Sequence, residues 1–209
     1  MTPASVNNSA RSGARKRPTG ADRRTEIVQI AGQLFAEKGF LATTIRDVAD
    51  AAGILSGSLY HHFTSKEAMV EELLREYWTK LLDGYREVVS ADLEAPEAAR
   101  GLIRASVVLL DECRLALGVM LNDWNYLSQT FPFMEESLRE CQKLWIEVLE
   151  QGVENGDFSD AMSPVITYRT VMSAVSGTAR WFSPQGRVSV DELADQMAAL
   201  FLDGMRARP

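Results

Sequence analysis

The stretch that most restricts the fold runs from residue 43 to 66 and reads TTIRDVADAAGILSGSLYHHFTSK. Its first half has apolar residues at the i, i+3, i+4 spacing of one helix face: Ile45, Val48 and Ala49. Thr44 is suited to cap this helix, and Gly53 can adopt the positive φ of a sharp reversal before a second helix opens at Ser56. Two short helices joined by a glycine turn form the geometry that places a helix in the major groove of DNA.

The second helix of this pair carries the candidate DNA contacts, which are hydroxyl, phenol and imidazole side chains: Ser56, Ser58, Tyr60 and His61. Such groups bind either phosphates or base edges, and Arg46 on the first helix could also reach either. Leu59 and Phe63 are better explained as core residues. A metal site at His61 and His62 is not expected, because adjacent side chains point about 100° apart on a helix.

The charge of the chain is divided between its two ends. The whole chain of 209 residues has a net charge of −7, yet residues 1–66 carry 9 Lys and Arg against 5 Asp and Glu. The remaining residues carry 13 basic and 24 acidic side chains. A basic head on an acidic body suits a protein that docks on nucleic acid at one end only.

Helical periodicity continues through the rest of the chain, without a sustained strand pattern, and predicts an all-α fold. The expected helices are 25–38, 65–90, one that begins at Ala95–Pro96, 115–127, 134–153, 164–182 and 190–205. The expected domains are a disordered basic arm (1–20), a helix-turn-helix DNA-binding domain (21–66) and a helical ligand-binding and dimerisation domain (67–209). The arginine and lysine cluster of the arm at residues 11–17 could follow a DNA backbone or serve only as a solubilising tail.

Residues 42–70, ATTIRDVADAAGILSGSLYHHFTSKEAMV, resemble the DNA-binding signature of TetR-family transcriptional regulators. That resemblance implies a three-helix N-terminal domain that reads an operator, and a helical C-terminal domain that binds a small ligand and dimerises. It also implies that Thr43, Thr44 and Lys66 contact phosphates, and that Tyr60 and His61 touch the DNA backbone. By the same resemblance Gly57 permits close approach of the protein backbone.

Within that family, the segment GILSGSLYHHF is similar to those of actinobacterial repressors of steroid-ring and fatty-acid catabolism, whose ligands are acyl-CoA thioesters. The chain departs from that subgroup at Ser176, where the subgroup places a tryptophan one helical turn before an arginine; Arg180 and Trp181 are kept. The resemblance therefore implies an acyl-CoA effector, or a related lipid or steroid catabolite, with its acyl part left open.

The body has the residues of an adaptable apolar cavity, since methionines and aromatic side chains are frequent there. The candidate ligand contacts are Met120, Trp124, Phe133, Trp145, Arg169, Arg180 and Trp181. Ordinary core packing is the simpler explanation for any single apolar member. The two arginines lie in an otherwise apolar helix, and an inward arginine requires an anion, either from a ligand or from an ion pair across a dimer.

Two alternative functions are a multidrug-sensing repressor and an acyl-CoA-binding enzyme. A multidrug-sensing repressor would need inward carboxylates, which Asp111, Glu112 and Asp123 could supply. An acyl-CoA-binding enzyme would need a nucleophile, and the body offers only Cys113 and Cys141 with no histidine. The sequence therefore favours a regulator that is not an enzyme and has no cofactor or metal.

The expected partners are double-stranded DNA with a palindromic operator, a small-molecule effector and a second copy of the chain. Small residues in the penultimate helix, such as Ser173 and Gly177, and Ala194 and Ala198 in the last helix predict a homodimer through those two helices. No apolar run approaches the ~20 residues that cross a bilayer, and no secretory leader is evident, so we expect a cytoplasmic protein.

Overall fold

The structure, a computed structural model, describes residues 20–206 and is helical throughout that range apart from turns and one isolated bridge, Phe158 to Arg206. Its helices are α1 (Gly20–Lys38), α2 (Ile45–Ala51), α3 (Ser56–Leu59), α4 (Lys66–Ser90), α5 (Ala95–Glu112), α6 (Arg114–Thr130), α7 (Phe133–Glu154), α8 (Pro164–Thr178) and α9 (Val190–Met205). The expectation of an all-α fold is confirmed. Residues 1–19 of the predicted basic arm lie outside the described residues, and its last residue, Gly20, is the first of α1.

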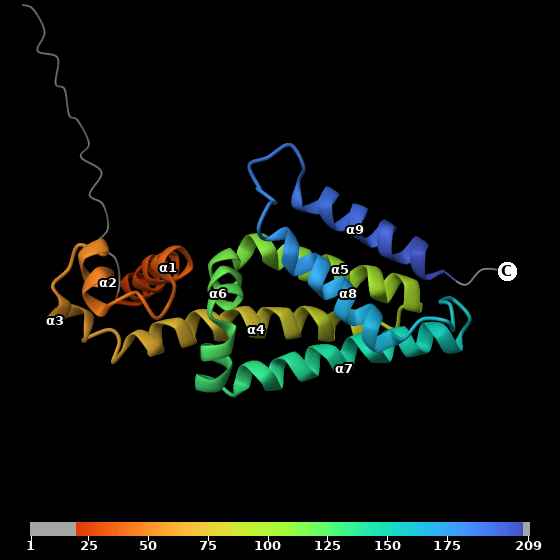
Figure 1. Cartoon of the computed structure of the whole chain (residues 1–209), viewed down its shortest axis with the longest axis horizontal. Helices are drawn as coiled ribbons and strands as arrows, with labels where there is room; N and C mark the ends of the chain where they lie inside the picture. Colours follow the sequence, from red (N-terminus) through yellow and green to blue (C-terminus); the bar gives the residue numbers. More distant parts are fainter. Residues whose placement is uncertain (1–19, 207–209) are drawn as a thin grey trace, which may run out of the picture.

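Helices α1–α3 and the start of α4 form a small domain at one end of the molecule (Figure 1), which we call the head. Thr44 caps α2 as predicted: its Oγ1 accepts from the Asp47 N–H, and its own N–H donates to the Asp47 carboxylate over 2.8 Å. The Thr44 hydroxyl also donates to that carboxylate, and the hydrogen bonds from this hydroxyl and from the Thr44 N–H lower the pKa of the Asp47 carboxyl. Gly53 has the predicted positive φ, 65°, at the reversal between α2 and α3.

Two helices of the head differ in length from the sequence prediction. Helix α1 begins five residues earlier, at Gly20 rather than Thr25. Helix α3 ends at Leu59, so that Tyr60 and His61 lie in the turn that follows it. The N–H of Phe63 still donates to the Leu59 carbonyl over 3.0 Å, which keeps the turn compact after the helix itself has stopped.

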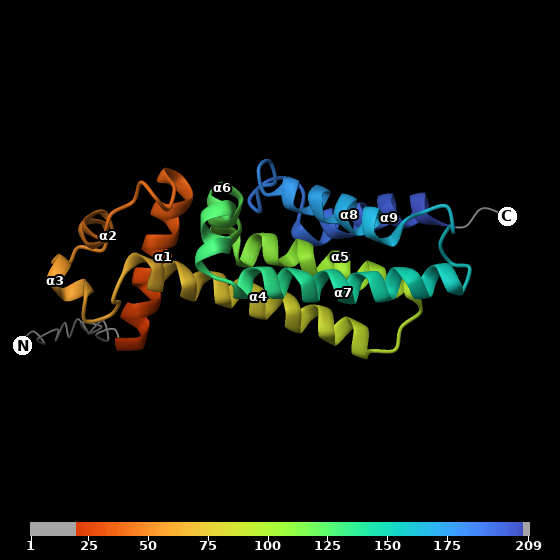
Figure 2. The same cartoon turned by 60° about the horizontal axis from the view of Figure 1, so that its bottom comes forward.

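Helix α4 connects the head to the larger bundle of α5–α9, which we call the body (Figure 2). Ser65 caps α4 by accepting from the Ala68 N–H, and one buried stripe, from Met69 to Tyr85, runs the length of the helix. In the body, α5 packs against α4, α7, α8 and α9 and is thus its central helix. Burial brings the Tyr85 hydroxyl within 2.6 Å of Ser106 Oγ, which in turn donates to the Leu102 carbonyl.

Helix α6 packs against α1 of the head and against α4, α5 and α7 of the body. It is not continuous, because Asp123 has non-helical torsion angles (φ −123°, ψ 21°) that kink it. Periodicity alone predicted neither this kink nor the end of α8 at Thr178, four residues before the expected end at Phe182. Within the described residues, no helix is long and apolar enough to cross a membrane.

Gly152 of α7 provides a test of the packing at the far end of the body. A Cβ at this position would lie 2.2 Å from the ring of Phe158, which is 2% exposed and cannot move aside into solvent. We expect Gly152→Ala to lower the free energy of unfolding by about 1–3 kcal/mol in urea denaturation. Gly204→Ala is the matched control, because a Cβ at Gly204 meets nothing within 4 Å. Equal stability of the two variants would contradict the packing described.

Candidate functional site

The head presents a polar surface at the end of the molecule opposite the C-terminus (Figure 1). Its exposed members include several of the predicted DNA contacts: Thr44, Arg46, Gly57, Ser58, Tyr60 and His61, with Ser56 partly exposed. The Arg46 side chain is 85% exposed and is only loosely paired with Asp50, at 3.8 Å. A Cβ at Gly57 would meet nothing within 4 Å, so the backbone of α3 is open to close approach.

Two residues that were predicted to contact phosphates instead form hydrogen bonds within the head. Thr43 is 1% exposed, and its hydroxyl donates to the Gly39 carbonyl over 2.8 Å. The Lys66 ammonium donates to the carbonyls of Phe40 (2.9 Å) and Thr43 (3.0 Å) and lies over the Phe40 ring. An ammonium group has three N–H donors, and the Leu41 carbonyl, 3.4 Å away, accepts from it too. Neither side chain is therefore placed to contact DNA in this structure.

Two arginines near the start of α1 also have structural partners. Arg23 donates to the Ala52 carbonyl over 2.6 Å, at the end of α2. Arg24 pairs with Glu72 of α4 and lies over the Phe63 ring, 3.9 Å from its centroid. These contacts hold α1 against the helix-turn-helix pair, and they account for two cations at a helix N-terminus, where the helix dipole disfavours them.

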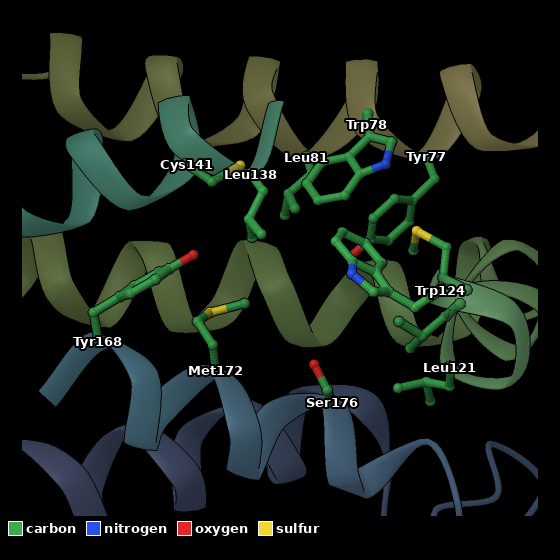
Figure 3. Close-up of a pocket in the computed structure, with 12 residues that line it drawn as sticks. Tyr77, Trp78, Leu81, Leu121, Trp124, Leu138, Cys141, Tyr168, Met172 and Ser176 are labelled. Carbon is green, nitrogen blue, oxygen red and sulfur yellow. The ribbon is translucent and has the colours of Figure 1, made fainter. Parts of the chain in front are cut away.

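The body contains an apolar cavity of about 240 Å³ between α4, α6, α7 and α8 (Figure 3). Its lining residues are Tyr77, Trp78, Leu81, Leu117, Met120, Leu121, Trp124, Leu138, Cys141, Tyr168, Met172 and Ser176. An engineered cavity of about 150 Å³ with an apolar lining holds benzene. The space in this body is therefore sufficient for a compact ring system or a short branched chain.

A wider groove of about 680 Å³ opens outside this cavity and shares part of its wall. The shared residues are Leu121, Leu138, Tyr168, Met172 and Ser176. Arg169 and Arg180 line only the groove, and both are exposed, which corrects the expectation that they point inward. Among the described residues, neither has an ion-pair partner, so an anionic group in the groove would find two available guanidinium groups.

The other predicted ligand residues divide into two groups. Met120 and Trp124 line the cavity as expected. Phe133 lies outside it, against the Arg75 guanidinium; Trp145 is fully buried behind Tyr168; and Trp181 is 67% exposed. The sequence did not predict that Tyr77 and Trp78 of α4 line the cavity, because the apolar stripe of that helix indicated only core packing. It also missed Met172, whose i+4 spacing from Tyr168 on α8 was the available signal.

Polar atoms in the cavity are neutral and few. The Trp78 Nε1–H is buried and has no hydrogen-bond partner among the described residues, and the Tyr168 hydroxyl points toward the cavity in Figure 3. Burial raises the pKa of Tyr168 to about 12 and that of Cys141 to about 12. The cavity therefore offers neutral groups, namely two phenols, a hydroxyl and a thiol, rather than anions, which suits binding of an uncharged group.

Helix α6 connects the cavity to the head. Met120, Leu121 and Trp124 line the cavity, whereas the residues between them reach α1 and the turn after it. The Asn122 side-chain amide donates to the Ala36 carbonyl over 3.1 Å, and the Asp123 carboxylate accepts from the Phe40 N–H over 2.8 Å. A change in the shape of the cavity would thus act directly on the base of the head.

The carboxylates considered for cationic ligands do not line the apolar cavity. Asp123 is held by the Phe40 N–H, while Asp111 and Glu112 line a separate small cavity of about 170 Å³ beside α1. Glu112 also lies 3.9 Å from the Lys80 ammonium. The arrangement therefore gives a cation no acidic group at the apolar cavity.

Comparison with known proteins matches both parts of the chain to families. Residues 27–73 match the bacterial regulatory proteins of the tetR family, and residues 92–205 match the tetracyclin repressor-like C-terminal domain. The HTH-type transcriptional repressor KstR2 of Rhodococcus jostii is 40% identical over 88% of this chain and 91% of its own length. The ketosteroid transcriptional regulator KstR2 of Mycobacterium tuberculosis is similar in structure, with a TM-score of 0.85 and 36% identity over 89% of this chain and 96% of that one.

A more distant structure, AibR in complex with isovaleryl coenzyme A and operator DNA, shares the fold, with a TM-score of 0.73 and 19% identity over 85% of this chain and 97% of that one. The family matches and the 40% identity to a curated repressor settle the classification. This chain belongs to the TetR family of bacterial transcriptional regulators.

Proposed function

We propose that the protein is a ligand-responsive repressor that binds a palindromic operator as a homodimer and leaves it when an acyl-CoA, or a related lipid or steroid catabolite, enters the body. The observation that carries this proposal is helix α6, which lines the apolar cavity with one face and binds the head with another. The KstR2 relatives are named as transcriptional repressors, which supports the direction of regulation.

The effector chemistry follows from the cavity and its outer groove. An apolar cavity of about 240 Å³ that opens to a groove with Arg169 and Arg180 suits a molecule with a compact apolar end and an anionic tail. A CoA thioester has that form, because its phosphates lie far from its acyl group. AibR, which has the same fold, was crystallised with such a thioester and with DNA. A cationic drug is less well matched, since no carboxylate lines the cavity.

A catalytic role has no support in the cavity. Cys141 is its only thiol, and burial keeps that group protonated by raising its pKa to about 12. A thiol must ionise to act as an effective nucleophile. We therefore infer that the thioester is bound and released unchanged.

The release step starts at Trp124. A group that fills the cavity must press against this side chain, and the adjacent Asp123 already lies at a kink, where α6 deforms most easily. Asn122 and Asp123 transmit the displacement to Ala36 and Phe40 of the head. Because half-sites lie about 34–36 Å apart, a few ångströms of displacement between two heads lowers affinity for the operator.

We infer that the second copy binds at α8 and α9, which Figure 1 shows together along one side of the body. Both carry large exposed apolar side chains: Ile166 of α8 is 66% exposed, and Leu200 of α9 is 73% exposed. Side chains of this kind mark protein interfaces when they gather on one side of a monomer.

Removal of the exposed polar side chains of the head tests DNA binding. We expect Ser58→Ala combined with Tyr60→Ala to lower affinity for the operator by about 10- to 100-fold without lowering the melting temperature. Lys66→Met is the contrasting variant, because its loss leaves three carbonyls without their donor. It should lower the melting temperature and leave the salt dependence of binding unchanged. A reduced salt slope for Lys66→Met would show that this lysine contacts phosphate.

Replacement of the groove arginines tests the anionic tail. We expect Arg169→Gln and Arg180→Gln each to weaken binding of an acyl-CoA by about tenfold, since each removes a charge-assisted hydrogen bond. The measurement is titration of tryptophan fluorescence with an acyl-CoA and with the corresponding free acid, which lacks the phosphates and should show no loss in either variant. Arg187→Gln is the matched control, an exposed arginine that lines neither the cavity nor the groove.

Asp123→Ala tests the connection between the cavity and the head. We expect this variant to bind the acyl-CoA with wild-type affinity, while the ligand lowers its affinity for the operator much less than it does in the wild type. The reason is that the Phe40 N–H loses its acceptor. Ligand binding and operator binding are measured separately, with Glu150→Ala as an exposed acidic control on α7. Full release of DNA from a folded Asp123→Ala variant would contradict the proposed route.

A further inference from the structure

Leu55 is the most exposed large apolar side chain among residues 20–206, at 79% exposure. It lies directly before α3, where its backbone is extended (φ −69°, ψ 142°). Its carbonyl accepts from the Ser58 N–H (2.8 Å) and the Leu59 N–H (3.2 Å), so its backbone starts the helix. Its side chain makes no such contribution, because it forms no capping hydrogen bond.

A leucine at the N-cap position lowers the stability of the helix that it precedes. Leucine ranks far below Ser, Thr, Asn and Asp at an N-cap, where replacement of a good cap by an apolar residue costs about 1 kcal/mol. This chain uses those better residues elsewhere: Thr44, Ser65, Ser163 and Ser189 each accept a hydrogen bond from the first turn of their helices. The two helices on either side of α3 in the chain are both among those with such a cap.

Core packing does not compensate for the missing cap. The neighbouring Ile54 packs against the buried core, but Leu55 is not among the residues that do so. Helix α3 lies at the end of the molecule farthest from α9 (Figure 1), so the body cannot cover the side chain either. Within residues 20–206, the Leu55 side chain therefore contributes to neither the helix cap nor the core, and we take its role to be a contact with a binding partner.

The surroundings of Leu55 identify the contact. It precedes the exposed Gly57 and Ser58, and a Cβ added to Gly57 would meet nothing within 4 Å. Side chains at the N-terminal end of a recognition helix are the ones that reach base edges in the major groove. Almost every feature of those edges is a hydrogen-bond donor or acceptor; the exception is the C5-methyl group of thymine, which apolar side chains contact.

We propose that Leu55 is a specificity-determining residue that reads a thymine methyl group in each operator half-site. The inference rests on the proposed function, since it requires that α3 enter the major groove. The inference gives Leu55, whose apolar side chain cannot bind phosphate, a role in reading a base. The polar side chains beside Leu55 would supply the hydrogen bonds to DNA.

Uracil substitution in the operator tests this directly, because uracil is thymine without the methyl group. The full-length protein first selects its operator from random duplexes, and each thymine pair related by the two-fold axis is then replaced by uracil. We expect one pair to weaken wild-type binding by about 15-fold, or about fourfold for each methyl group, the effect of one buried CH₂. In the Leu55→Ala variant, replacing that same thymine pair by uracil should not lower operator affinity further. Replacement of every other thymine pair should change operator affinity as it does for the wild type.

Two further variants separate a reading role from a structural one. Leu55→Ser supplies a good N-cap, so it should raise the melting temperature by about 2–4 °C while it lowers operator affinity and removes the uracil effect. Leu41→Ala removes another exposed leucine of the head, 61% exposed in the segment before α2, and should keep the full uracil effect.

The outcomes distinguish this inference from the proposed function. If the wild type selects an operator but no uracil pair weakens binding, or if the effect persists in Leu55→Ala, the reading role is wrong and DNA binding still stands. If no duplex is selected from the random pool, the proposed function itself fails.

Discussion

The proposed communication between the two parts of this protein depends on the hydrogen bond from the Phe40 N–H to the Asp123 carboxylate. It joins the turn after α1 to the kink in α6, over 2.8 Å. A regular α6 would place residue 123 in helical geometry; the structure instead keeps a local distortion beside a cavity-lining tryptophan. Bistable or easily deformed elements are where small displacements become large ones. One helix, α6, therefore contacts both the cavity and the base of the head.

Positive charge in the head has two separate uses. Lys66, Arg23 and Arg24 hold the short helices in place by donating to backbone carbonyls and to Glu72. Such short helices have little stability of their own, since an isolated helix of fewer than ~12 residues is marginal in water. Arg46, by contrast, remains exposed and only weakly paired. A count of basic residues alone thus does not show which cations are free to contact nucleic acid.

The sequence predicted most of the fold, because the buried stripes of α4, α7 and α9 repeat at helical spacing and their ends coincide with capping residues or breakers. It predicted Thr44 as a cap for the same local reason. The errors in the site are long-range. Lys66 is near Phe40 only after the chain has folded, and no local pattern shows that its ammonium is already occupied. Likewise, Arg169 of α8 and Arg180, which follows the end of that helix, are exposed because of how this part of the chain packs in the bundle, and no local pattern shows that.

Tyr168, Met172 and Ser176 belong to both the cavity and the outer groove, and they follow one another at intervals of four along α8. Intervals of four place side chains above one another on one helix face, so these three residues form a single threshold that any occupant must cross. A change in one of them would alter the shape of both the cavity and the groove, while α6 and the head keep their own residues. Descendants of this gene could therefore acquire new inducers by exchanging a few side chains on one helix, with the operator and the switch unchanged.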